Sequence, residues 1–537
     1  MFQKHSSKEK KMRMLKVVFV LIHLLAAAVL ANPLSKNDFP PHFLFGASSS
    51  AYQVEDAANE DGRKPSIWDT FVHAAGNGAV SLCIYNLISA ISKIHRGDKD
   101  IGCDQYHKYK EDVKLMVKMG LDAYRFSISW SRLVPDGKGP INPKGLQYYN
   151  NLINELISQG IQPHITLHHL DLPQALEDEY GGWLRRRVVK DFTAYADVCF
   201  REFGDRVKYW TTVNEGNLFA FGGYESGLLP PQRCSPSSIP NCSRGNSSTE
   251  PYLVAHHILL AHASAARLYR KKYQDKQHGF IGLNLLTFGF VPLTKTSDDI
   301  NATQRAQDFY TGWFLNPLIF GEYPGIMKKN AGSRLPVFTK RESNLVKGSM
   351  DFLGINFYYT FLVKNNPDSL RSEDRSFTAD MAAELEYLTG NGSSTYEHPI
   401  TPWILKEILA SLKKDYGNFP VYIHENGQQT QRNSSLDDRP RVKYLCKYIG
   451  SLLDILRDGV NLRGYFVWSF LDMFEVLNGY ESSYGLYFID LKDPALRRQS
   501  KLSSVWYSNF LNNGNIPKVT IMDIEKNASV LSNTVTA

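Results

Sequence analysis

Residues 207–215 read Val-Lys-Tyr-Trp-Thr-Thr-Val-Asn-Glu, a short β-branched and aromatic run that ends on an amide and a carboxylate. This composition predicts a buried β-strand. The segment that follows at 252–273 has apolar residues at helical spacing, which predicts an amphipathic helix. A strand followed by a helix is the repeating unit of an α/β fold.

The same unit recurs along the chain. The sequence predicts strands at 43–53, 121–130, 161–169, 207–215, 280–288, 350–359, 420–425 and 462–470. It predicts helices at 104–119, 143–159, 191–203, 252–273, 303–314, 402–416, 441–457 and 500–511. Eight such repeats indicate a single (β/α)₈ TIM barrel over residues 38–512. A doubly wound open sheet is disfavoured, because no glycine-rich phosphate loop follows the first predicted strand.

The candidate site residues of the chain lie at the ends of the predicted strands. In a barrel of this kind the active site lies at the C-terminal ends of the strands. Polar or aromatic side chains end seven of the eight predicted strands: Gln53, Arg125, His169, Asn214, Glu215, Asn356, Tyr358, Glu425 and Trp468. We therefore expect these side chains to converge on one pocket.

Two carboxylates in that group point to a reaction class. Glu215 ends its strand, and Glu425 ends another and is followed by Asn-Gly. Glycoside hydrolysis needs one carboxyl group to protonate the leaving oxygen and a second to attack the sugar or to activate water. The pair therefore predicts glycoside hydrolysis.

Composition and charge suit a globular protein rather than a nucleic-acid partner. The 537 residues are 43% hydrophobic and 21% charged, with a formal net charge of +7. Six basic residues and one acidic residue fall within the first thirty positions, so the remainder carries only +2. No dense basic stretch interleaved with aromatic residues occurs elsewhere, which argues against nucleic-acid binding.

The N-terminal residues predict a secretory route. Residues 1–31 combine a basic stretch, an apolar run and small residues, which is typical of a signal peptide. We expect no membrane anchor after its removal, a polar tail at 513–537, and an extracellular or vacuolar protein. Six Asn-X-Ser/Thr sequons are candidate glycosylation sites: Asn241, Asn246, Asn301, Asn391, Asn433 and Asn527.

The cysteines do not have metal-ligand spacing. Cys234 and Cys242 flank a Pro/Ser-rich loop and could close a small disulfide ring. Cys199 and Cys446 lie on apolar helical patterns, which predicts buried thiols.

Taken in order, the motifs resemble family 1 of the glycoside hydrolases, in particular the secreted plant β-glucosidases. The resemblance extends from about Asp38 to Leu511. It rests on Thr-Val-Asn-Glu at 212–215, Glu-Asn-Gly at 425–427 and further motifs at 43–53, 124–130, 166–173, 354–359 and 468–472.

The resemblance implies roles for individual residues. It makes Glu425 the nucleophile and Glu215 the general acid/base of a retaining enzyme, whose carboxyl groups should lie about 5–5.5 Å apart. It implies sugar contacts from Gln53, His169, Asn214, Tyr358, Trp468 and Glu475, and supporting roles for Arg125 and Asn356. It implies no metal and no organic cofactor, and it leaves the oligomeric state open.

Electrostatics should separate the two carboxyl groups. The Arg125 cation and the Tyr358 hydroxyl should hold the pKa of Glu425 below its ordinary value. The charge on Glu425 should raise the pKa of Glu215, which lets Glu215 begin the reaction protonated.

The chain departs from the family pattern at several positions. Gly216, His424, Val476 and Leu170 replace Pro, Thr, Trp and an aromatic residue, and we expect all four to alter the edge or wall of the pocket. Asp56 replaces a glycine. An apolar insertion at 79–100 either forms a helix over the pocket mouth or is translated intron sequence.

The predicted function is a retaining β-glucosidase that hydrolyses O-β-glucosides of small aromatic or apolar alcohols. Two alternatives stay open on the same scaffold. One is an acyl-glucose-dependent glucosyltransferase, and the other is an inactive sugar-binding homologue.

Overall fold

A computed structural model describes residues 34–73, 102–236, 242–373, 375–389, 396–432 and 436–512. The predicted signal peptide at 1–31, the insertion at 79–100 and the tail at 513–537 lie outside these ranges, so their assignments stay predictions. Among the described helices, none is long and apolar enough to cross a membrane. Asn246 and Asn301 are exposed, whereas the other four sequon asparagines fall outside the described ranges.

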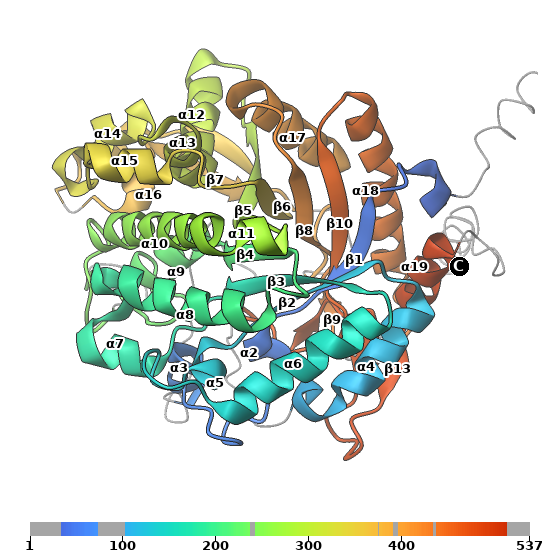
Figure 1. Cartoon of the computed structure of the whole chain (residues 1–537). Coiled ribbons are helices and arrows are strands. Elements are labelled where there is room, and N and C mark those ends of the chain that lie inside the picture. The colour runs from blue at the N-terminus through green and yellow to red at the C-terminus, as the bar shows by residue number, and fades with distance from the viewer. Residues whose placement is uncertain are drawn as a thin grey trace, which may run out of the picture.

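Eight parallel strands close into a barrel, which confirms the predicted fold (Figure 1). Pairing of β5 with β6 completes the ring, in the order β5-β4-β3-β2-β1-β10-β8-β6. The strands are β1 Leu44–Ser48, β2 Ala123–Ser127, β3 Gln162–His168, β4 Tyr209–Val213, β5 Phe280–Pro292, β6 Phe352–Asn365, β8 Val421–Asn426 and β10 Leu462–Trp468.

Helices surround the barrel and connect successive strands (Figure 1). The main ones are α4 Gln105–Met119, α6 Pro143–Ser158, α8 Arg187–Phe203, α10 Glu250–Lys272, α12 Ser297–Gln307, α13 Trp313–Phe320, α17 Pro402–Tyr416, α18 Arg439–Arg457 and α19 Leu502–Leu511. Local sequence sets their ends: Asn142 caps α6 ahead of Pro143, and Gly120 ends α4 at φ +89°.

Shorter elements form the loops around the barrel. The helices are α2 Ala51–Val54, α3 Ile67–His73, α5 Trp130–Leu133, α7 Gln174–Tyr180, α9 Gly216–Tyr224, α11 Gln274–Gln277, α14 Gly325–Ala331, α15 Lys340–Val346 and α16 Phe377–Asp380. The strands are β7 Ala383–Tyr387, β9 Thr430–Gln431, β11 Ser482–Ser483, β12 Tyr487–Ile489 and β13 Arg498–Ser500.

Some predicted boundaries were wrong. The first strand ends at Ser48, and Gln53 lies in α2, because the chain turns at the serines and Ala51 N–H donates to Ser127 Oγ at 2.7 Å. The helix predicted at 303–314 is divided between α12, a π-helical turn at Asp308–Gly312 and α13. β5 and β6 run past their predicted ends because they keep pairing with each other beyond the barrel rim.

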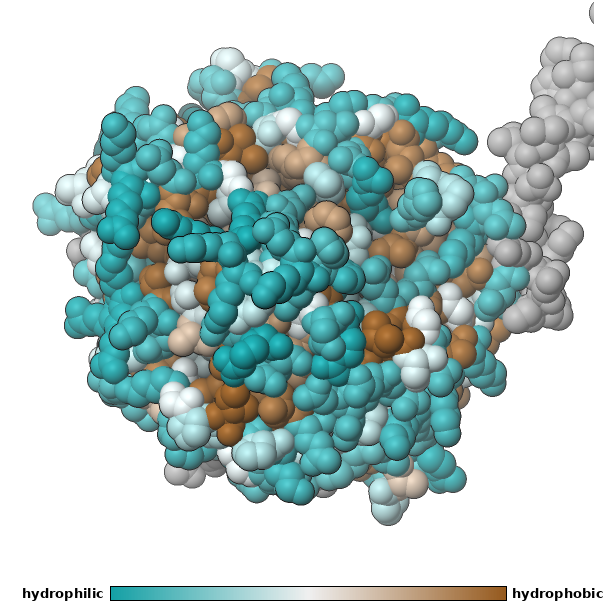
Figure 2. All heavy atoms as spheres, viewed as in Figure 1, coloured by the Kyte–Doolittle hydropathy of each residue, from teal (hydrophilic) through white to brown (hydrophobic). Residues whose placement is uncertain are grey.

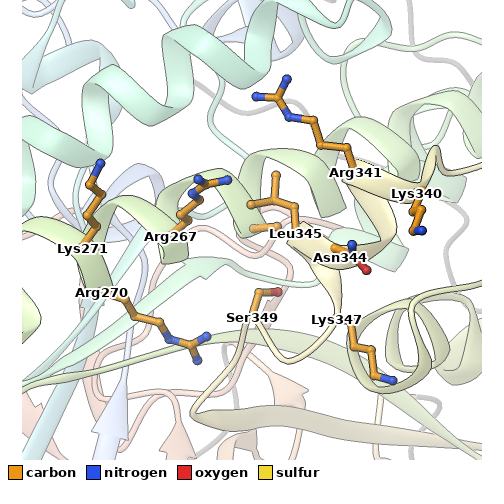
Figure 3. Close-up of a pocket in the computed structure, with 10 residues that line it drawn as sticks. Arg267, Arg270, Lys271, Lys340, Arg341, Asn344, Leu345, Lys347 and Ser349 are labelled. Atoms are coloured by element: carbon orange, nitrogen blue, oxygen red, sulfur yellow. The ribbon is translucent and has the colours of Figure 1, made fainter.

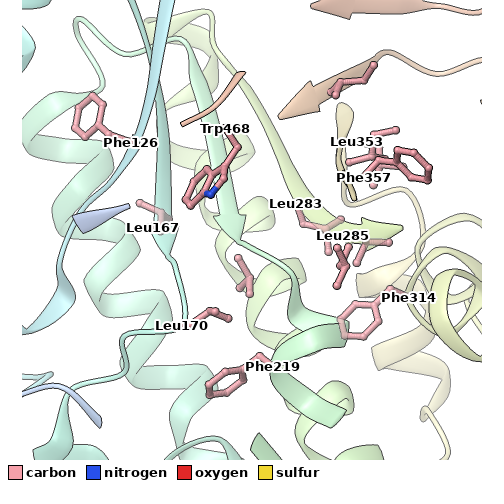
Figure 4. Close-up of a cluster of buried hydrophobic side chains, with 14 of the residues drawn as sticks. Phe126, Leu167, Leu170, Phe219, Leu283, Leu285, Phe314, Leu353, Phe357 and Trp468 are labelled. Atoms are coloured by element: carbon pink, nitrogen blue, oxygen red, sulfur yellow. The ribbon is translucent and has the colours of Figure 1, made fainter. Parts of the chain in front are cut away.

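Successive side chains of each strand point to opposite faces of the sheet, and this divides the core into two parts. Leu283 and Leu285 of β5 and Leu353 and Phe357 of β6 are buried among apolar side chains (Figure 4). The alternate positions, such as Asn284 and Gly354, face the barrel interior. A separate small cluster there contains Ala123, Phe352, Tyr422 and Phe466. The polar residues of the strands described below therefore lie inside the barrel ring, whereas Gln53 belongs to α2.

Candidate active site

A cavity of about 180 Å³ is lined by residues at and beyond the C-terminal ends of the barrel strands. Seven of the predicted site residues line it: Gln53, His169, Glu215, Tyr358, Glu425, Trp468 and Glu475. Arg125, Asn214 and Asn356 are fully or almost fully buried and contact these residues from below the cavity surface. The structure thus brings together all ten residues expected to form the site.

Glu425 is held at both carboxylate oxygens. Arg125 Nη1 donates to Oε1 at 2.6 Å, and the Tyr358 hydroxyl donates to Oε2 at 2.9 Å. All three side chains are buried. A charge-assisted bond and a hydroxyl donor leave the carboxylate little freedom to rotate.

Glu215 follows Asn214 just beyond the end of β4 and has a left-handed backbone, with φ +46° and ψ +50°. A residue other than glycine pays a conformational cost there, and such residues cluster at functional sites. Asn356 Nδ2 donates to Glu215 Oε1 at 2.8 Å. This contact leaves Oε2 as the oxygen that can carry a proton.

Asn214 connects the two carboxyl groups. Its Oδ1 accepts from Arg125 Nη2 at 2.6 Å and from Asn356 Nδ2 at 3.3 Å. Its amide nitrogen must therefore be the group that lies 3.1 Å from His169 Nε2 and donates to it. The His169 ring stacks on Trp468 with centroids 5.8 Å apart, so the contacts continue to another residue expected to contact the sugar.

The pKa values separate the two carboxyl groups, although not entirely as expected. Burial, followed by the charge on Glu425, raises the pKa of Glu215 to about 8. Burial also raises the pKa of Glu425, so the expectation of a pKa below the ordinary value was wrong. Arg125 and Tyr358 do lower it, but removal from water outweighs them. Because these two partners favour ionised Glu425, we assign the first ionisation of the pair to Glu425.

Gln53 and Glu475 lie at another side of the cavity. Gln53 Nε2 donates to the Phe474 carbonyl oxygen at 2.6 Å, and Ser50 Oγ donates to Gln53 Oε1 at 2.6 Å. Burial raises the pKa of Glu475 to about 8, with Asp472 acting in the same direction. Its Oε1 has no hydrogen-bond partner within the described part of the chain. An unpaired buried oxygen on the cavity wall is suited to accept a substrate hydroxyl.

Several residues of the site were not predicted from the strand pattern. Asn284 lies within β5 and donates to Asn356 Oδ1 at 2.8 Å. An amide side chain within the largely apolar run of that strand was the available signal. Gln429, His398 and Tyr484 also line the cavity. They come from loops beyond the strands, and no strand pattern could have indicated them.

Of the four residues that depart from the family pattern and were expected at the pocket, two line the cavity and two do not. Leu170 and Val476 line the cavity, as expected. Gly216 begins α9, where an added Cβ would meet Phe314 at 2.9 Å. It is outside the cavity lining, so its expected place at the pocket edge was wrong. His424 is fully buried and also outside that lining, so its expected place at the pocket wall was wrong.

The predicted disulfide between Cys234 and Cys242 is confirmed. Of the other predicted thiols, Cys199 is buried and Cys446 is half-buried. A Cβ on Gly227 would lie 2.4 Å from Cys242 Sγ, and the next residues, Leu228 and Leu229, line the cavity. The disulfide therefore supports one wall of the cavity.

Replacing both disulfide cysteines with serine should lower the free energy of unfolding by about 2–3 kcal/mol, the chain-entropy scale for so short a ring. The Michaelis constant should rise as well, because the loop that carries Leu228 and Leu229 loses its cross-link. Thermal unfolding and steady-state kinetics measure both effects. Cys446→Ser, at a free thiol, is the matched control and should change neither, whereas an unchanged unfolding temperature in the double variant would contradict the prediction.

A larger hollow, of about 870 Å³, lies between α10 and α15 on the outside of the barrel. Arginine and lysine side chains surround it (Figure 3), and its lining has no carboxylate and no aromatic ring. It lacks the groups that glycoside hydrolysis needs, so the smaller strand-end cavity is the candidate active site. On the face shown in Figure 2, hydrophilic side chains predominate and the hydrophobic surface is divided into separate spots.

Comparison with known proteins agrees with the site. The model for glycosyl hydrolase family 1 matches residues 35–516. The chain is 55% identical over 515 residues to β-glucosidase 11 of Arabidopsis thaliana, covering 91% of this chain and 95% of that protein. It is 51% identical over 486 residues to an acyl-glucose-dependent cyanidin 3-O-glucoside 7-O-glucosyltransferase of Delphinium grandiflorum, covering 89% and 91%.

A solved structure is also similar. It is a mutant of a rice β-glucosidase in a covalent complex with glucose, with a TM-score of 0.83 and 44% identity. The match covers 89% of this chain and 99% of the rice chain.

Proposed function

The chain belongs to glycosyl hydrolase family 1, and from this membership we propose that it is a retaining β-glucosidase acting on O-β-glucosides. The observation that carries the proposal is the pair of buried carboxyl groups on one cavity. Glu425 is held by Arg125 and Tyr358, and Glu215 has a pKa raised to about 8. One group is thereby suited to attack and the other to donate a proton.

The first step forms a covalent glucosyl-enzyme. A Glu425 carboxylate oxygen attacks the anomeric carbon as the bond from that carbon to the leaving oxygen breaks. The proton on Glu215 passes to the leaving oxygen, so the alcohol departs neutral. The negative charge that began on Glu425 ends on Glu215.

The second step returns the enzyme to its starting state. Esterification removes the negative charge of Glu425, and this lowers the pKa of Glu215 because that charge had raised it. Ionised Glu215 then takes a proton from water, whose oxygen attacks the anomeric carbon and displaces Glu425. Two displacements at one carbon retain its configuration.

The composition of the cavity wall favours substrates whose leaving alcohol is apolar or aromatic. Beyond the carboxyl groups, the lining is mainly hydrophobic and includes Leu218, Phe221, Leu228, Leu229, Leu286 and Phe288. Apolar surface of this kind binds an aglycone by excluding water.

A glucosyltransferase is the second candidate, favoured by the likeness to the acyl-glucose-dependent enzyme of Delphinium. The two functions share the first displacement and differ in what attacks next. Incubation with an aryl β-glucoside, and separately with an acyl-glucose plus an acceptor alcohol, distinguishes them. Free glucose from the first supports the hydrolase, transfer only in the second supports the transferase, and no product in either indicates an inactive sugar-binding protein.

Removal of the Arg125 cation should shift the acid side of the pH profile. In Arg125→Met the pKa of Glu425 rises, because Arg125 lowers it in the native site. The acid limb of kcat/KM should therefore move to higher pH, and the maximum should fall by about 10²–10³-fold. Arg125→Lys keeps the charge and should move the limb less. An unchanged acid limb in Arg125→Met would contradict the assignment.

We also propose that the protein enters the secretory pathway and acts outside the cell or in the vacuole. The disulfide and the exposed sequon residues Asn246 and Asn301 support this proposal. Enzymatic removal of N-glycans should increase the electrophoretic mobility of the natural protein, and unchanged mobility would count against it.

A further inference from the structure

His424 occupies an irregular position in β8. On the neighbouring strand β6, Ile355 pairs with Ile423 and Asn356 pairs with Glu425, so His424 is an extra residue without a partner there. This is a β-bulge, a feature that redirects side chains next to active sites. Regular alternation would place His424 and Glu425 on opposite faces.

The bulge lets both residues face the barrel interior. Glu425 lines the cavity. The His424 ring lies below it among interior rings, with centroids 5.6 Å from Phe466 and 5.9 Å from Phe352. A Cβ on Gly354 would lie 2.2 Å from His424 Nδ1, so the absence of a side chain there makes room for the imidazole.

Hydrogen bonds connect this ring to the proposed acid/base. Asn284 Nδ2 lies 3.3 Å from His424 Nδ1 and 2.8 Å from Asn356 Oδ1. Asn356 Nδ2 in turn lies 2.8 Å from Glu215 Oε1. Hydrogen bonds thus connect His424 with the Glu215 carboxyl group through Asn284 and Asn356.

The donor and the acceptor of each hydrogen bond follow from the bond between Asn356 and Glu215. Ionised Glu215 can only accept, so Asn356 presents its amide nitrogen to Glu215 and its oxygen to Asn284. Asn284 must then present its nitrogen, and its second N–H points to His424 Nδ1. Nδ1 is therefore the acceptor, and the ring proton resides on Nε2. Burial lowers the pKa of His424 well below its ordinary value, which keeps this acceptor unprotonated.

We propose that His424 is a positioning residue for the acid/base: through Asn284 it orients the Asn356 amide, which holds Glu215 Oε1 and leaves Oε2 to carry the proton. The inference rests on the proposed function, in which Glu215 exchanges that proton with the leaving alcohol and with water. The bulge places the imidazole where no regular strand position could.

Other charged and titratable groups face the same residues. Arg125, Glu425, Tyr358 and Tyr359 act on or beside Glu215. Arg125 and His164 face His424. The variants below alter none of these groups, so a change in the pH profile reports on the hydrogen-bonded connection itself.

The test compares His424→Phe, which fills the space without an acceptor, with His424→Gln, whose amide oxygen can accept. The measurement is the pH profile of kcat/KM for an aryl β-glucoside. Because the Asn356 donor lowers the pKa of Glu215, its misorientation in His424→Phe should move the basic limb up by about half a pH unit to one unit. His424→Gln should restore the limb toward its native position.

Asn284→Leu removes the middle connection and should move the limb in the same direction, which keeps the test decisive if His424→Phe does not fold. The limb position does not depend on how much enzyme is folded. A role in packing alone would leave the limb unmoved in both variants, and that result would overturn the inference. In Glu215→Gln the basic limb should disappear. If it persists, the proposed function fails, which is distinct from a failure of the His424 connection alone.

Discussion

Glu425→Gln is expected to abolish turnover, with kcat reduced by about four orders of magnitude or more, the scale seen when a covalent nucleophile is removed. A neutral amide cannot form the glucosyl ester. The amide oxygen can still accept from Arg125 or Tyr358, so the fold should survive. Steady-state hydrolysis of an aryl β-glucoside by folded protein measures the effect.

A control accompanies that prediction. Cys446→Ser, at a half-buried free thiol, should retain full hydrolysis under the same conditions. Hydrolysis by Glu425→Gln at the native rate would remove Glu425 from the nucleophile role and, with it, the double-displacement mechanism.

Glu215→Gln should reduce hydrolysis by about 10²–10⁴-fold for substrates with poor leaving groups. Activated phenols leave without protonation, so their first step should be much less affected. The ratio of kcat/KM for an alkyl glucoside to that for a nitrophenyl glucoside therefore measures the acid role. Equal losses for both substrates would count against the assignment.

Azide provides an independent measurement on the same variant. The small anion needs no general base, so it should attack the glucosyl-enzyme and yield the β-glucosyl azide. Failure of azide to accelerate turnover of an activated substrate by Glu215→Gln would show that the second step does not depend on Glu215 as base. The carboxyl separation of about 5–5.5 Å expected of a retaining enzyme stays a prediction.

The strand pattern predicted much of the site because of how a parallel barrel is built. Its strands all point the same way, so residues at their C-terminal ends converge whatever lies between them in the chain. Glu215 and Glu425, which are 210 positions apart in the sequence, could be paired for that reason alone. Trp468 and His169 were assigned on the same argument, and their rings do stack.

Residues outside that pattern could not be placed in advance. Gln53 was assigned to a strand end and lies in α2, since β1 ends at Ser48 and the chain turns at the serines that follow. Gln429, His398 and Tyr484 reach the cavity from loops, whose paths depend on packing rather than on local periodicity.

The sequence by itself determined the barrel, the location of the site and the identity of both carboxyl groups. The hydrophobic periodicity of each segment is a local property, and the strands of a parallel barrel all point the same way, so their C-terminal ends meet. Only the tertiary structure decided the direction of the pKa shift of Glu425 and the place of His424. The pKa of Glu425 depends on a balance between burial and Arg125, which are known only once distant segments meet. The bulge at His424 is defined by the pairing of β8 with β6, and the sequence of one strand does not show with which residues of another strand it pairs.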